Sequence, residues 1–262
     1  MTFVGVEAGE GRSRLRMTGG NLAPRLISQD ARGAKVALVA TTAMLLGGDR
    51  VDLELRVGCG AWLEIVETAG TVAYDADGAA SSWNVDVVIG DGGLLIWHGE
   101  PFVVSDGANT LRHSSFELGE RASMCLRETV VLGRTGEAGG SVRVQNRVQR
   151  GHPVLIEDLD LSDRATRELP GVTGGATVLD TLTLIGRPAP APNPPPGHFF
   201  TLDDGGAVAR VLRSGLAGSP VAQWWPAWSA AAREGYDATS ARRVANAGAS
   251  AMSTAVVTSG TT

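Results

Sequence analysis

Residues 47–60 read GGDRVDLELRVGCG, and this stretch decides the fold class. From Val51 to Val57 apolar side chains alternate with charged ones, and glycine-rich turns flank the run on both sides. A period of two places one row of side chains in a core and the other in solvent, which is typical of a β-strand with one buried face. Glycine adopts the positive φ angles of tight turns without steric cost. The stretch therefore predicts one strand over 51–57 between two turns.

The same alternation returns over 83–89 and over 142–148, and glycine-rich turns again stand at 90–93 and 139–140. No segment of helical length lies between these runs to serve as a crossover, so a doubly wound α/β fold is disfavoured. We expect a mainly β protein made of stacked or helically wound sheets, antiparallel or mixed, with one or two short α-helices near the C-terminus.

The chain divides into four parts by composition. Residues 1–187 hold the alternating runs and are expected to form a β-rich core. A proline-rich segment, 188–197, cannot form ladder hydrogen bonds and is predicted to be an extended linker. Residues 198–236 are expected to add a strand and a helix to the same domain. The small residues of 237–262 have little apolar periodicity and predict a disordered tail.

The predicted C-terminal helix starts with Ser219 as its N-cap and Pro220 as its first residue. It ends before Gly235 and carries Trp224 and Trp228 on one face. Large aromatic side chains on one face indicate an apolar surface that needs a cover.

Composition narrows the class of partners. The chain of 262 residues has 43% hydrophobic and 19% charged residues, which suits a packed core. Its net charge of −5 gives no broad attraction to phosphate backbones, so a nucleic-acid partner is not expected. The longest apolar stretch, 36–46, is well short of the ~20 residues that span a bilayer, and residues 1–20 lack the apolar run of a signal peptide. We therefore expect a cytoplasmic protein with no membrane partner.

Familiar catalytic and metal-binding patterns are missing from the sequence. The P-loop needs a Gly-Lys-Ser/Thr step, but the one lysine, Lys35, follows alanine. The four histidines do not fall at metal-ligand spacing, and Cys59 and Cys125 lie far apart outside any C-x-x-C motif. Both cysteines are interpreted as buried thiols of a reducing compartment. No tightly bound cofactor and no closed metal site are expected.

Three stretches, taken in order, resemble the UreD (UreH) family of urease accessory proteins. They are Met44–Asp49 with the strand and the Gly58–Ala61 turn that follow it, Leu126–Arg134, and Arg147–Glu157. Each stretch is short, but three in the right order and spacing across one β-rich chain are far more specific than any one of them.

The resemblance implies that the chain is not an enzyme but a β-rich scaffold required for urease maturation. It also implies assembly with UreF and the GTPase UreG, docking of that complex on apo-urease, and an internal water-filled tunnel for nickel in transit. A scaffold of this kind is expected to expose an apolar patch to its partners, and Trp224, Trp225 and Trp228 are the candidates.

The resemblance also suggests which residues meet the nickel. Asp49, Glu128 and Glu157 match positions where family members carry acids of the tunnel, and Thr71 matches a polar position beside them. Oxygen ligands suit a migrating cation, because they bind a borderline metal more weakly than thiolates or imidazoles do.

Each acid also has a purely structural interpretation. Asp49 follows two glycines and could bind the backbone N–H groups of its own turn. Glu128 could form an ion pair with Arg127 or Arg134, and Glu157 could be an exposed strand residue.

Two other functions stay open from the sequence. Glu128 and Glu157 could serve as the acid–base pair of a hydrolase on a β scaffold, although few aromatic residues are available to stack against a sugar. Alternatively, the chain could be an interaction domain without any nickel path.

Overall fold

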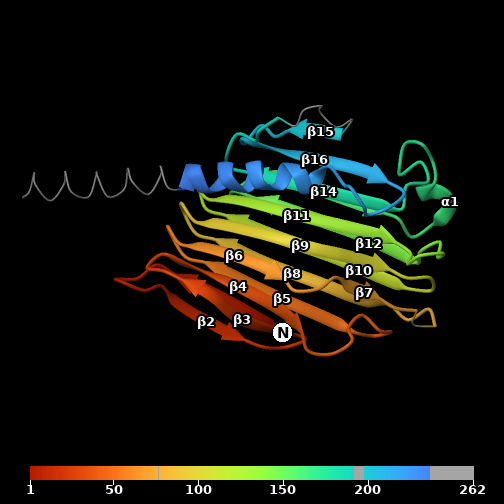
Figure 1. Ribbon diagram of the computed structural model, residues 1–262, viewed down its shortest axis with the longest axis horizontal. Coiled ribbons are helices and arrows are strands. Elements are labelled where there is room, and N and C mark those ends of the chain that lie inside the picture. The colour runs from red at the N-terminus through yellow and green to blue at the C-terminus, as the bar shows by residue number, and fades with distance from the viewer. Residues whose placement is uncertain (76, 192–197, 237–262) are drawn as a thin grey trace, which may run out of the picture.

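Two stacked β-sheets form the protein in the computed structural model, which describes residues 1–75, 77–191 and 198–236 (Figure 1). Sheet A has seven strands, in the order β13 (Pro153–Asp160), β12 (Ser141–Gln149), β10 (Asn109–Leu118), β8 (Ser81–Ile89), β5 (Arg50–Val57), β1 (Thr2–Glu7) and β2 (Arg14–Thr18). Sheet B has nine, in the order β15 (His198–Thr201), β16 (Gly206–Arg213), β14 (Val178–Ile185), β11 (Ser123–Leu132), β9 (Leu94–Val104), β6 (Trp62–Glu67), β4 (Gly33–Ala40) and β3 (Leu22–Gln29), with β7 (Thr71–Ala73) beside β9.

The middle of the chain winds like a solenoid between the two sheets. Strands β5, β8, β10 and β12 pair in parallel in sheet A, while β4, β6, β9 and β11 pair in parallel in sheet B. Antiparallel strands close both ends of the winding. The predicted class, mainly β with helically wound mixed sheets, is confirmed.

Glycines stand where successive turns of the winding stack on one another. The N–H of Gly90 donates to the Val57 carbonyl at 2.7 Å, and the N–H of Gly119 donates to the Ile89 carbonyl at the same distance. A Cβ atom on Gly90 would lie 2.7 Å from the backbone nitrogen of Cys59. Side chains are excluded there because the backbones of neighbouring turns touch.

The core lies between the sheets and follows the predicted alternation. In β5 the apolar side chains from Val51 to Val57 are buried, whereas the charged side chains between them are partly exposed. The same pattern holds in β8 and β12, so the three strands predicted from alternation are confirmed.

A helix over 221–236 covers part of the outer face of sheet B, the face turned away from sheet A (Figure 1). Its buried side chains include Val221, Trp228 and Tyr236, which pack with Leu182 and Leu184 of β14. A second helix, α1 (Arg164–Arg167), is a single turn whose N-cap Asp163 accepts from the Thr166 N–H. No helix in the described ranges is long and apolar enough to cross a membrane.

The predicted end of the helix, the exposure expected for Trp228 and the burial expected for Cys59 were wrong, whereas Cys125 is buried as expected. The helix continues through Gly235, and the Ser219 hydroxyl donates to Asp180 of β14. Trp228 is 1% exposed, so it packs the helix onto the sheet and offers no surface to a partner. Cys59 is exposed, because it occupies a corner between the two sheets where no strand covers it. Most of the predicted linker and the whole predicted tail lie outside the described residues.

Candidate functional site

Five polar side chains interrupt the apolar core between the sheets. They are Arg112 of β10, Glu128 of β11, Asn146 of β12, Glu157 of β13 and Arg210 of β16, and we call them the interlayer belt. Alternation explains their position, because each shares the inward row of its strand with core residues. Three of the strands belong to sheet A and two to sheet B, so the belt bridges the layers.

The buried end of the belt is an ion pair across the layers. Arg112 of sheet A donates through Nη1 to Oε1 of Glu128 in sheet B, and the two residues are 9% and 8% exposed. Asn146 Nδ2 lies 3.3 Å from Glu128 Oε2 and 3.2 Å from Glu157 Oε2, so one amide joins the two carboxylates. Each group satisfies part of its neighbour's hydrogen-bonding capacity, as burial of charge requires.

The outer end of the belt is a second ion pair, in which sheet A supplies the carboxylate and sheet B supplies the guanidinium. Glu157 of sheet A accepts from Arg210 Nη1 of sheet B at 2.6 Å, and Arg210 Nε donates to Thr181 Oγ1 at 2.9 Å. The side chains of Glu157 and Arg210 are 21% and 22% exposed. The belt therefore reaches solvent where β13 and β16 run near the edge of the sandwich.

Two small cavities border Glu128. The edge cavity, about 20 Å³, is lined by Glu128, Asn146, Glu157 and Arg210, together with Thr181. The bulge cavity, about 10 Å³, is lined by Glu67, Thr71, Glu100, Arg112, Arg127 and Glu128. A volume of about 10–15 Å³ open to a water-sized sphere holds one water molecule. Glu128 alone of the belt carboxylates borders both cavities.

The bulge cavity lies at an irregularity of sheet B. Pairing between β9 and β11 shifts register between Arg127 and Thr129, which pair with His98 and Pro101. Neighbouring residues in a strand point to opposite faces, yet Arg127 and Glu128 line the same cavity. The bulge therefore places the cavity where the ladder between β9 and β11 is interrupted, and bulges are often found next to functional sites.

Beside the bulge cavity, on the outer face of sheet B, Arg127 belongs to a polar cluster. Arg127 donates to Asp180 through Nε at 3.2 Å and Nη2 at 2.9 Å, and its Nη1 lies 3.0 Å from His98 Nε2. Burial and the charge of Arg127 lower the pKa of His98, so the ring is neutral and its Nε2 accepts this hydrogen bond. Trp225 lies edge-on to the same ring, with centroids 4.9 Å apart.

Glu67 is a cavity carboxylate that sequence patterns missed. It ends β6, and its carboxylate accepts from Trp97 Nε1 at 2.9 Å and from the Glu100 N–H at 3.0 Å. Burial raises its pKa to about 7 in spite of these bonds and of the nearby charge of Arg112. In the sequence, Glu67 is marked only by its position at the end of a strand, directly before the short loop that leads to Thr71 of β7.

The structure brings three of the four predicted nickel residues together and separates the fourth. Glu128 lines both cavities, Glu157 lines the edge cavity and Thr71 lines the bulge cavity. Asp49 instead accepts from the Leu46 N–H at 3.0 Å, within the turn before β5. It borders neither cavity, and its role in nickel transfer stays a prediction.

The sequence suggested Arg127 or Arg134 as the ion-pair partner of Glu128, and both were wrong. Arg127 points to the outer face and binds Asp180, while Arg134 lies past the end of β11 and binds Glu137. Arg112, sixteen residues before Glu128, is the partner. Glu157 is turned inward and paired, so it is not the exposed strand residue of the alternative interpretation.

Orphaned polar atoms indicate that the cavities suit water. Within the described segments, Trp83 Nε1 and Arg112 Nε beside the bulge cavity and Asn146 Oδ1 beside the edge cavity have no protein hydrogen-bond partner. Buried polar atoms of this kind are normally bound to internal water. No group of three or more His, Cys, Asp or Glu residues forms a closed metal site in the described ranges.

The edge cavity is too small for a hydrolase substrate. A glycosidase needs a sugar ring between its two carboxylates, whereas this cavity holds about one water molecule. Both carboxylates are also paired with arginine and bridged by Asn146. The geometry argues against the hydrolase interpretation.

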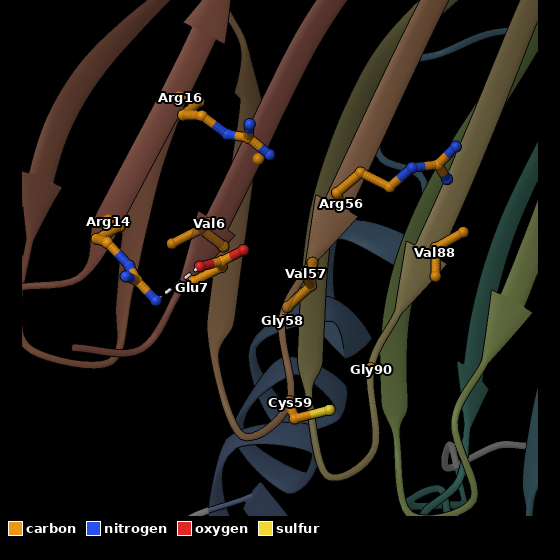
Figure 2. Close-up of a pocket in the computed structure, with 11 residues that line it drawn as sticks. Val6, Glu7, Arg14, Arg16, Arg56, Val57, Gly58, Cys59, Val88 and Gly90 are labelled. Carbon is orange, nitrogen blue, oxygen red and sulfur yellow. Dashed lines mark ion pairs between the residues drawn. The ribbon is translucent and has the colours of Figure 1, made fainter.

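A larger open groove, of about 440 Å³, lies on the outer face of sheet A (Figure 2). Figure 2 shows Arg14 turned toward Glu7, to which it is paired at 2.9 Å, with Arg16 on the same strand and Arg56 nearby. Arg14 is paired with Glu7 and Arg56 with Glu54, so Arg16 leaves one excess positive charge at this groove, which would repel a cation. The interlayer belt, not this groove, is therefore the candidate for cation chemistry.

Comparison with known proteins gives consistent matches. A model of the family described as UreD urease accessory protein matches residues 5–258. The chain is 43% identical over 216 residues to urease accessory protein UreD 1 of Streptomyces griseus, covering 80% of this chain and 84% of that protein. It is 35% identical over 198 residues to urease accessory protein UreD 1 of Saccharopolyspora erythraea, covering 73% and 77%. It is 34% identical over 204 residues to urease accessory protein UreD of Frankia casuarinae, covering 71% and 61%.

Proposed function

Because the chain belongs to the UreD urease accessory protein family, whose members are non-catalytic proteins of urease maturation, we propose that it passes nickel to apo-urease through the interlayer belt. In this proposal nickel is cargo and not a resident cofactor. The chain acts in the cytoplasm as the scaffold that docks UreF and UreG onto apo-urease.

The observation that carries the proposal is the position of Glu128 between two cavities. On one side the edge cavity leads past Glu157 to the solvent-exposed edge of the sandwich. On the other side the bulge cavity borders Glu67 and Thr71 at the irregularity of sheet B. Each cavity therefore borders Glu128 and at least one further carboxylate, Glu157 in the edge cavity and Glu67 in the bulge cavity, which supports a stepwise route for nickel.

The ligands along this route suit a cation that must be released again. Carboxylate, amide and hydroxyl oxygens hold a borderline divalent metal less tightly than thiolates or imidazoles. The thiol of Cys125 faces away from the route on β11, and burial raises its pKa to about 12, so it stays protonated. Among the described residues, no cysteine or histidine lines either cavity, so nickel there would meet oxygen ligands.

A route through the molecule needs a donor at one mouth and a receiver at the other. UreF with UreG, and apo-urease, are the proposed partners at these two ends. Burial of Trp228 argues against that side chain as a docking surface, whereas Trp224 and Trp225 are partly exposed and stay candidates. The proposed contacts lie near the edge of the sandwich and near the bulge cavity, where Trp225 packs against His98.

The test removes the central ion pair as a unit. A chain with Arg112→Gln and Glu128→Gln loses the carboxylate without leaving a buried unpaired charge, which by itself would cost about 3–5 kcal/mol. Nickel content of urease matured with this variant should fall, most clearly when nickel is scarce. Binding to UreF and urease in a pull-down should persist, because the belt is interior.

The matched control is the ion pair of Arg143 and Asp158 on the outer face of sheet A. The double change Arg143→Gln and Asp158→Asn removes the same kinds of group far from the route, and nickel loading should stay normal. Full loading of urease by the Arg112, Glu128 variant would contradict the route and leave only a docking role.

A further inference from the structure

Both carboxylates of the belt are already occupied by guanidinium groups. Arg112 holds Glu128 and Arg210 holds Glu157, each from the opposite sheet. At Glu128, between the two cavities, and at Glu157, in the edge cavity, a cation thus meets a neutralised pair and not a free carboxylate. In this arrangement the charges of both belt carboxylates are compensated, so neither attracts a second cation strongly.

We propose that Arg112 and Arg210 are gates, and that a divalent cation passes only by displacing each guanidinium from its carboxylate. This inference rests on the proposed route and adds its regulation. Coulomb attraction scales with charge, so at one position a divalent cation is attracted about twice as strongly as the singly charged guanidinium. A monovalent ion has no such advantage, which makes the two arginines selective for divalent cargo.

Each guanidinium has a favourable interaction available when its ion pair with the carboxylate breaks. Arg210 is partly exposed at the edge of the sandwich, so its guanidinium can turn toward water. Arg112 already lies with its Cζ 5.7 Å from the centre of the Phe102 ring while it is paired with Glu128, so this ring can continue to attract the guanidinium when the ion pair breaks. Its Nε has no hydrogen-bond partner among the described residues, so only the Nη1 contact to Glu128 must break there.

Asn146 completes the site when the gates open. It is 8% exposed, and its Nδ2 bridges the two carboxylates while its Oδ1 has no partner in the described part of the chain. An amide carries a donor and an acceptor that exchange places when the group rotates by a half-turn. Rotation would give the edge cavity three oxygen ligands, from Glu128, Asn146 and Glu157.

The experiment measures Ni²⁺ affinity of the full-length chain by calorimetry. Arg210→Gln and Arg112→Gln should each bind Ni²⁺ at least about tenfold more tightly than the wild type, since the carboxylate is then free. Arg143→Gln, which frees Asp158 on the outer face, is the control and should bind like the wild type. Adding Asn146→Leu to Arg210→Gln should abolish the gain.

Arg210 is less buried than Arg112, so Arg210→Gln is less disruptive to folding. If Arg112→Gln does not fold, the Ni²⁺ affinity of Arg210→Gln tests the proposal. Wild-type Ni²⁺ affinity in the folded Arg210→Gln chain would overturn the gate. A gain that survives Asn146→Leu would remove Asn146 from the site.

Affinity and delivery separate the gate from the route. If the Arg112, Glu128 double variant delivers less nickel while the single arginine variants bind Ni²⁺ like the wild type, the route stands and the gate falls. If that double variant delivers nickel fully, the route falls, whatever the affinities are.

Discussion

At the scale of single residues, Glu67 shows how the fold changes an ordinary carboxyl group. Its carboxylate lines the bulge cavity, where burial raises its pKa from 4.5 to about 7. The folded chain therefore binds this proton more tightly than the unfolded chain does. The stability that the protonated group contributes is fully present below its unfolded pKa and is lost as the pH rises through about 7.

Glu67→Gln should remove this pH dependence. Between about pH 5 and about pH 8 the wild type should lose roughly 2 kcal/mol of unfolding free energy relative to the variant, which cannot ionise there. Urea denaturation at the two pH values measures the difference. Glu137→Gln is the control: its ion pair lowers the pKa of Glu137 to about 2, so its effect should be equal at both values. An equal effect of Glu67→Gln at both values would show that Glu67 is not buried as described.

At the scale of elements, the helix over 221–236 is held to sheet B by its aromatic face. Trp228 packs among Leu182, Leu184 and Cys125, and its ring lies edge-on to Phe199 with centroids 6.3 Å apart. Ser219 adds a polar anchor through its hydrogen bond to Asp180, which is fully buried. The helix is thus part of the folded chain and does not depend on a partner for its cover.

Trp228→Ala should therefore destabilise the isolated chain by about 3–5 kcal/mol, the usual loss for a buried large aromatic side chain. The free energy of unfolding, measured without any partner, tests this. Gln223→Ala on the exposed side of the same helix should change it little. A Trp228→Ala chain as stable as the wild type, yet deficient in a pull-down, would return Trp228 to the docking surface.

At the scale of the whole molecule, the interlayer belt places charged side chains among apolar residues between the two sheets. A solenoid of this size could fill the space between its sheets with apolar side chains, as it does elsewhere. Desolvation of two charges offsets most of their attraction, so a buried ion pair contributes little net stability. The presence of such a pair therefore fits the proposed function in transfer better than a function in stabilising the fold.

Replacing the pair by Arg112→Met and Glu128→Leu should leave the unfolding free energy unchanged or raise it by about 1–4 kcal/mol. Nickel content of urease matured with this chain should nevertheless fall. Thermal unfolding of the chain and metal analysis of urease measure the two effects on one variant. A loss of stability by more than about 2 kcal/mol would make the pair a structural fastener between the sheets.

The sequence by itself determined the fold class, the strands over 51–57, 83–89 and 142–148, and the resemblance to one family. These follow from local alternation and glycine spacing, which a strand shows without knowledge of its neighbours. The exposure of Cys59 and the extent of the C-terminal helix did not follow, because both depend on what packs against them.

Only the tertiary structure decided the partner of Glu128. Its chain neighbour Arg127 points to the opposite face because side chains alternate along a strand, and it binds Asp180. The true partner, Arg112, lies on the previous strand of the winding, and consecutive strands of a two-layer solenoid belong to facing sheets. Residues about one strand and one turn apart thus meet across the core, while adjacent residues are separated by the thickness of a sheet.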